Sequence, residues 1–155
     1  MPFGSLLQRI RPLTSDQALA LQRYRQQAAR VIDEVQRLSD DWLNLVQYES
    51  EAERLANVAA VHRWTLARTS ERHRQELPPR LAAQIHRAIQ QALVDTTRAF
   101  QLLANGHRSH TLDAICDGQS LLTDSVAAIE AARQRLDIMY ETRVPEVATR
   151  GSSAS

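Results

Sequence analysis

The sequence predicts an all-α protein, an antiparallel up-down-up-down four-helix bundle. Apolar residues recur at alternating steps of three and four, the spacing of helices that pack on one another. Glycine and proline are scarce, with 4 and 5 among 155 residues, which disfavours a sheet rich in turns. Four segments carry the pattern, and we predict helices at residues 16–47, 51–76, 79–104 and 111–142.

The first helix is predicted to begin after a capping box. The Thr14 hydroxyl would accept from the Gln17 backbone N–H, and the Gln17 side chain would reach back to the cap. We interpret Tyr24 and Trp42 as core residues because they lie in register with the apolar stripe. That stripe comprises Leu21, Tyr24, Ala28, Val31, Val35, Leu38, Trp42 and Leu45.

The second helix is predicted to begin after a tight break at Gln47–Glu51. The register slips by three residues after Leu45, and a slip of that kind either overwinds a helix or ends it. Ser50-x-x-Glu53 has the form of a second capping box. The alternative is a long bent or continuous helix over residues 16–77, packed with two shorter helices.

Three histidines of the middle segments receive different predictions. His62 lies in the stripe of the second helix and is expected to be a hydrogen-bonded core histidine, whereas His73 and His86 are expected at the surface. The stripe of the second helix comprises Tyr48, Ala52, Leu55, Ala59, His62 and Leu66.

Proline and glycine set the predicted limits of the third helix. Pro78 ends the second helix, and Pro79 is expected as the first residue of the third, where its missing N–H has no cost. Asn105-Gly106 is interpreted as a C-cap. The expected inward residues are Leu81, Ile85, Ile89, Ala92, Thr96, Phe100 and Leu103.

The fourth helix contains three residues that do not suit a simple apolar stripe. Gly118 lies in its middle, where glycine costs about 1 kcal/mol relative to alanine, and close helix approach is the natural explanation. Gln119 and Arg133 occupy stripe positions and are expected at its edge, in reach of water. The stripe comprises Leu112, Ile115, Gln119, Leu122, Val126, Ile129, Arg133, Leu136 and Tyr140.

Composition indicates one bundle domain, residues 14–144, between an amphipathic N-terminal segment at 1–13 and a tail at 145–155 that is expected to be disordered. Hydrophobic residues make up 43% of the chain and its net charge is +1, so no global attraction to nucleic acid is expected. Every cationic side chain other than histidine is an arginine. The single cysteine, Cys116, fits a reducing compartment, and we expect a cytoplasmic protein without a transmembrane segment.

Catalytic motifs are missing from the sequence. It contains no Glu-x-x-His pair, HExxH, GxGxxG, Walker loop or CxxC, so we expect neither an enzyme nor a bound cofactor.

The predicted topology gathers different side chains at the two ends of the bundle. Glu49, His107 and His110 would lie at one end, where they are weak candidates for a divalent metal. The other end would be basic, and its guanidinium groups are candidates for binding phosphate or an acidic partner. These arginines are Arg68, Arg72, Arg74 and Arg80.

Three functional hypotheses follow. The first is an adaptor that binds other proteins, or a second copy of itself, through a helix face or the basic end. The second is an accessory protein that binds nucleic-acid phosphates through the arginines, with affinity that falls steeply as salt rises. The third, with least support, is a metal-binding bundle.

Overall fold

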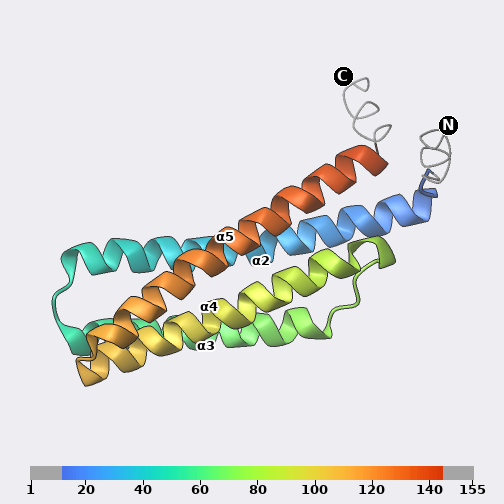
Figure 1. The fold of residues 1–155 in the computed structure, drawn as a ribbon. Helices are drawn as coiled ribbons and strands as arrows, with labels where there is room; N and C mark the ends of the chain where they lie inside the picture. The colour runs from blue at the N-terminus through green and yellow to red at the C-terminus, as the bar shows by residue number, and fades with distance from the viewer. Residues whose placement is uncertain (1–11, 145–155) are drawn as a thin grey trace, which may run out of the picture.

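The computed structural model describes residues 12–144 and confirms the predicted fold class. Four long helices follow one another with short connections, and no strand occurs among the described residues. They form an antiparallel bundle of two layers, with α4 and α5 lying in front of α2 and α3 (Figure 1). The helices are α2 (Ser15–Tyr48), α3 (Ala52–Gln75), α4 (Ala83–Ser109) and α5 (Leu112–Arg143), and a 3₁₀ turn, η1 (Arg80–Ala82), precedes α4.

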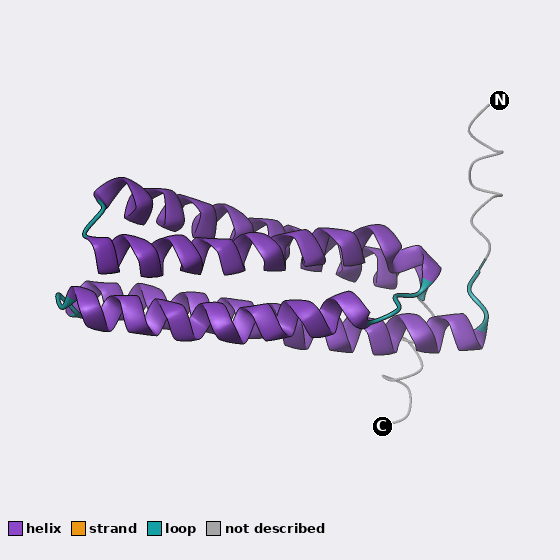
Figure 2. Cartoon of the chain, turned by 90° about the horizontal axis from the view of Figure 1, so that it is seen from below, coloured by secondary structure: helices purple, strands orange, loops and turns teal. Residues whose placement is uncertain are grey.

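The chain reverses between Tyr48 and Ala52, so the predicted break is confirmed and the continuous helix over residues 16–77 is wrong. The α2–α3 and α4–α5 connections lie at one end of the bundle and the α3–α4 connection at the other (Figure 2). The second capping box does not form. Glu51 is the N-cap of α3 without a side-chain hydrogen bond, and its backbone N–H donates to Glu49 instead.

The first capping box forms as predicted, with both reciprocal bonds between Thr14 and Gln17. Pro79 does not begin the third helix. It is the N-cap of η1, so the long helix α4 starts four residues later than expected. The predicted N-terminal segment and C-terminal tail lie outside the described residues, apart from Pro12, which is exposed, and Leu13, which packs partly against the core.

The predicted C-cap at Asn105-Gly106 is wrong, because α4 continues through Ser109. His110 ends it in the left-handed conformation, with φ of 53°. Gly106 serves packing instead, since a Cβ at this position would lie 2.8 Å from Cγ1 of Ile115 on α5. An Asn-Gly pair looks the same in sequence whether it supplies a positive φ or a close contact.

The four helices pack in the cyclic order α2, α3, α4, α5, and α4 makes the most extensive contacts, with α3 on one side and α5 on the other. Gly118 permits the α4–α5 approach, because a Cβ there would lie 2.9 Å from Cγ of Leu103 and 3.1 Å from the carbonyl oxygen of Ala99. Trp42 and Phe100 fill the core where the two layers meet, with rings edge to face.

The two polar stripe residues of α5 lie at the edge of the core, as predicted. The amide oxygen of Gln119 accepts from the indole N–H of Trp42 at 3.3 Å. Arg133 forms ion pairs with Asp33 and Glu130. Within residues 12–144, the helices are all too polar or too short to cross a membrane.

Candidate functional site

A chain of buried and partly buried polar side chains links α2, α3 and α4. The Tyr24 hydroxyl lies 3.0 Å from Nδ1 of His86, and the His86 ring stacks on that of His73 with centroids 3.9 Å apart. Nδ1 of His73 lies 2.7 Å from the amide oxygen of Gln90, whose Nε2 donates to the Ser70 hydroxyl at 3.0 Å. We call these five residues the polar chain.

The prediction that His73 and His86 are surface residues is wrong, since both are buried. Extending the α3 stripe by its own rule, three residues and then four after Leu66, reaches Thr69 and His73. The sequence therefore contained this signal. His86 was harder to find, because α4 buries a second stripe, offset from the predicted one, against its other neighbour.

The pKa shifts of the three titratable residues in the polar chain, Tyr24, His73 and His86, all favour the neutral side chain. Burial, and secondarily the nearby Glu76 carboxylate, raises the pKa of Tyr24 far above its ordinary value. Burial lowers the pKa of His73 and of His86, and the neighbouring His73 lowers that of His86 further. The lowered pKa values favour the neutral form of both rings, and the tautomer of His86 sets the direction of its hydrogen bond with the Tyr24 hydroxyl.

His62 is half-buried, with its ring edge to face against Phe100 at 5.3 Å between centroids. Its Nε2 is buried and has no hydrogen-bond partner among the described residues, so the core location was predicted correctly but the hydrogen bond was not. Burial lowers the pKa of His62, as expected for a ring held in an apolar setting.

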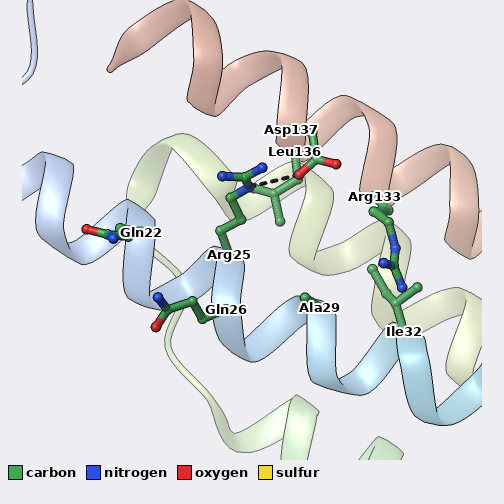
Figure 3. A pocket seen from close by; sticks show the side chains of 8 residues that line it. All are labelled: Gln22, Arg25, Gln26, Ala29, Ile32, Arg133, Leu136 and Asp137. Atoms are coloured by element: carbon green, nitrogen blue, oxygen red, sulfur yellow. Dashed lines mark hydrogen bonds and ion pairs between the residues drawn. The ribbon is translucent and has the colours of Figure 1, made fainter. Parts of the chain in front are cut away.

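Two grooves of equal volume, about 310 Å³ each, flank α2. The groove toward α5 includes Arg25, Arg133 and Asp137, and Figure 3 shows Arg25 reaching across it to Asp137. That ion pair measures 2.8 Å, and the Arg25 guanidinium also lies over the Tyr140 ring. Every charged side chain of this groove therefore has an intramolecular partner.

The groove toward α3 is built differently. It is lined by Arg30, Glu34, Arg72 and Glu76 together with the buried ring of His73. Glu34 accepts from the Thr69 hydroxyl at 3.0 Å. Within residues 12–144, the other three charged groups, Arg30, Arg72 and Glu76, form neither an ion pair within 4.0 Å nor a side-chain hydrogen bond.

The four predicted basic-end arginines do not converge on one point. Arg68 lies over the Trp64 ring at 4.7 Å, and Arg74 pairs with Glu71 at 2.6 Å. Arg72 lines the α2–α3 groove, whereas Arg74 lines a shallower depression between α3 and α4. The remaining one, Arg80, is exposed in η1.

The metal candidates lie at the predicted end of the bundle but are separately engaged. Glu49 pairs with Arg54 at 3.4 Å, and the His107 ring packs against Trp42 with centroids 5.8 Å apart. His107 and His110 border the same groove as Glu53. No group of three or more His, Cys, Asp or Glu side chains in the described part of the chain is arranged to hold a metal ion.

The outer face of α3 carries an exposed aromatic residue. Trp64 and Val61 are each 61% exposed and lie three residues apart, on the side of the helix opposite its buried positions. Arg68, one turn further along, covers one side of the Trp64 ring. We call Val61, Trp64, Arg68 and Arg72 the outer α3 face.

Comparisons with known proteins identify no family or similar protein for this chain. A scan against protein-family models found no match, and neither the curated proteins nor the solved structures gave one. The functional argument therefore rests on the chain's own geometry.

Proposed function

We propose that this chain is a non-enzymatic interaction protein that binds an acidic protein through the outer α3 face. The exposed Trp64 ring is the observation that carries the proposal. Scattered exposed apolar residues are ordinary on protein surfaces. Here Val61 extends the apolar surface by one turn, and Arg68 adds a cation over the ring. Trp and Arg are the residue types most enriched among the strongest contributors to protein interfaces.

The energy available at this face is large for a single turn of helix. Complete burial of a tryptophan removes about 150–250 Å² from water. Because Trp64 is 61% exposed, its remaining accessible area corresponds at about 25 cal/mol per Å² to roughly 2–4 kcal/mol before the entropic costs of association. Trp64 is already partly covered by Arg68, so the gain would come from the part of the ring that is still exposed.

Charge favours an acidic partner over a second copy of the chain. The outer α3 face presents Arg68 and Arg72, and Glu71, which is three residues from Arg68, is already paired with Arg74. Two copies meeting through this face would bring arginines together, whereas carboxylates of a partner would pair with them. Arginine binds carboxylates through two parallel hydrogen bonds, which also fixes the orientation of the partner.

Tryptophan fluorescence tests the proposal, because the chain has only two tryptophans and Trp42 is buried. The probe is an amphipathic helical peptide of leucine and glutamate, with a leucine–lysine peptide as its charge-reversed control. We expect a saturable blue shift of Trp64 emission with the acidic peptide alone, and no shift in W64F. R72A should weaken binding by about tenfold or more, since a charge-assisted bond contributes roughly 1.5–3 kcal/mol.

The matched control is R98A, which removes an exposed arginine from α4 and should leave the affinity unchanged. If neither peptide shifts the wavelength of Trp64 emission, the proposal is contradicted. Sedimentation that finds a dimer which W64A dissociates would show that a second copy occupies this face instead.

The phosphate-binding hypothesis gains no specific observation, because the four candidate arginines do not converge and Arg74 is already paired with Glu71. Duplex DNA at low salt, added in the same titration, tests it directly. The expected cytoplasmic location likewise remains a prediction from the single cysteine.

A further inference from the structure

Two histidine rings are stacked where α3 and α4 approach their connection. His73 is the third residue from the end of α3, and His86 is the fourth residue of α4. The ring centroids lie 3.9 Å apart with an angle of 18° between the planes, and the two residues are 1% and 8% exposed. The stack therefore joins the last turn of α3 to the first turn of α4.

Each ring also has a polar partner on another helix. The Tyr24 hydroxyl of α2 lies 3.0 Å from Nδ1 of His86. Because α2 and α4 are not adjacent in the cyclic packing order, this contact crosses the interior of the bundle. Nδ1 of His73 lies 2.7 Å from the amide oxygen of Gln90 on α4. Three helices thus meet through the two rings at one end of the bundle.

A protonated His73 ring would have one more donor than its surroundings can accept. Protonation makes both ring nitrogens donors. Nδ1 faces the Gln90 oxygen, but Nε2 is buried and has no hydrogen-bond partner within residues 12–144. A charged donor that is buried without an acceptor is more costly than a neutral one. Burial accordingly lowers the pKa of His73, although Gln90 and Glu76 partly oppose this shift.

A proton on the second ring, His86, is opposed by three features. Two imidazolium rings in a stack repel each other, and His73 is the stacked partner. His86 lies in the first turn of α4, where the helix dipole disfavours a cation, and that turn contains no acidic residue. Tyr24 offers no countercharge, because burial raises the pKa of its hydroxyl far above the ordinary value.

The charged residues around the stack do not supply a surplus of negative charge. The groove that His73 lines is bordered by two cations and two anions, so their charges balance. These are Arg30 and Glu34 of α2 and Arg72 and Glu76 of α3. The charged residues nearest to His86 in sequence, Arg80 of η1 and Arg87 of α4, are exposed cations. Nothing in this setting favours two imidazolium charges over two neutral rings.

We propose that the stacked His73–His86 pair is a pH-sensitive clasp. While both rings are neutral, it holds the last turn of α3 and the first turn of α4 together, and when both are protonated it releases these turns without unfolding the rest of the bundle. Local opening costs little at this place, because helix ends fray easily and the connection beside them is open to solvent, with Leu77 95% exposed. The clasp lies on the buried side of α3 and does not depend on the outer α3 face.

Amide hydrogen exchange in the full chain, measured by NMR at pH 7.5 and pH 5.5 and corrected for intrinsic rates, tests the proposal. The reporters are the amides of residues 72–75 and 87–89, whose helical bonds lie at the two helix ends. We expect their opening equilibrium to rise by about tenfold to a hundredfold at the lower pH, up to about tenfold per ring for each pH unit below 6.5. Low concentrations of urea should change this opening little, because it exposes little surface.

The variant H73Q/H86Q removes both titrating rings, and its opening equilibrium should change by less than about twofold between the two pH values. The matched control is H110N, which removes an exposed histidine outside the stack and should keep the full wild-type response. Asparagine suits this position because the backbone φ there is 53°. A second measurement needs no stable variant: in the wild type, the signals of the two stacked rings should titrate in two separate steps.

Three results would overturn the proposal. One is exchange of the reporter amides with the same urea dependence as amides in the middle of α4, which would mean that the ends open only by global unfolding. Another is a response to pH that persists unchanged in H73Q/H86Q. The third is titration of both rings in the folded protein in one step at the ordinary histidine pKa.

Discussion

Substituting Gly118 by alanine should test how closely α4 and α5 approach. The new Cβ would lie 2.9 Å from Cγ of Leu103, and 3.1 Å from both the Leu103 nitrogen and the Ala99 oxygen. The last two atoms belong to the backbone of α4 and cannot rotate away, so the helices must separate. Overpacking of this kind costs about 1–3 kcal/mol. Alanine also has a helix propensity about 1 kcal/mol more favourable than that of glycine, so we expect the free energy of unfolding to fall by up to about 2 kcal/mol.

The two effects can be separated with a second variant in the same helix. Ala128 is exposed on α5, and A128G there should cost about 1 kcal/mol through propensity alone. Urea unfolding, followed by circular dichroism, gives both changes in the free energy of unfolding. The decrease in unfolding free energy in G118A contains the packing cost minus the propensity gain, and the decrease in A128G measures that propensity term. Their sum therefore gives the packing cost, which should be about 1–3 kcal/mol. If G118A stabilises the protein by as much as A128G destabilises it, the reasoning is refuted.

Three further predictions concern stability. Because burial lowers the pKa of His73 and His86 in the folded state, the unfolded chain binds protons first as the pH falls. The contribution of these two rings to the free energy of unfolding should therefore be complete above about pH 7 and decline below about pH 6.5, by at most about 1.4 kcal/mol per pH unit for each ring. Urea unfolding midpoints measured across this pH range should decline less steeply in the double variant H73Q/H86Q. T14A removes the cap hydroxyl that accepts at 3.2 Å and should cost about 0.5–2 kcal/mol, visible as a lower thermal midpoint; an unchanged midpoint would contradict the capping box. The buried hydroxyls of Thr96 and Ser125 lie 3.0 Å apart, so a double-mutant cycle with T96V and S125A should give a coupling of about 0.5–1.5 kcal/mol, whereas simple additivity would argue against the bond.

Periodicity predicted the helices because each one buries a stripe, and a stripe is visible in sequence. The break before Ala52 could be found because a three-residue slip leaves no register for a straight helix. The limits of α4 could not be found, since Gly106 reads as a cap unless the position of Ile115 is known. Sequence alone does not reveal which helix has two close neighbours.

The candidate sites were predicted less well, for a related reason. Arg72 and Arg74 are two residues apart, and a helix turns such a pair to different sides, so proximity in sequence did not produce a cluster. The polar chain depends on the second buried stripe of α4, which placed His86 beside His73. Trp64 was not singled out, although its position two residues from both His62 and Leu66 places it opposite the predicted stripe; the structure adds that its side chain is 61% exposed.

The cyclic packing order has a consequence for how the protein is made. Of the four helices, α2 leaves the ribosome first, yet one of its two neighbours, α5, is the last of the four. One side of the apolar stripe of nascent α2 therefore stays uncovered until α5 has been made, while α3, α4 and α5 can each dock on the helix made just before. Closure of the bundle by α2 and α5 is the step that requires the longest loop, and the chain cannot complete it until α5 has emerged.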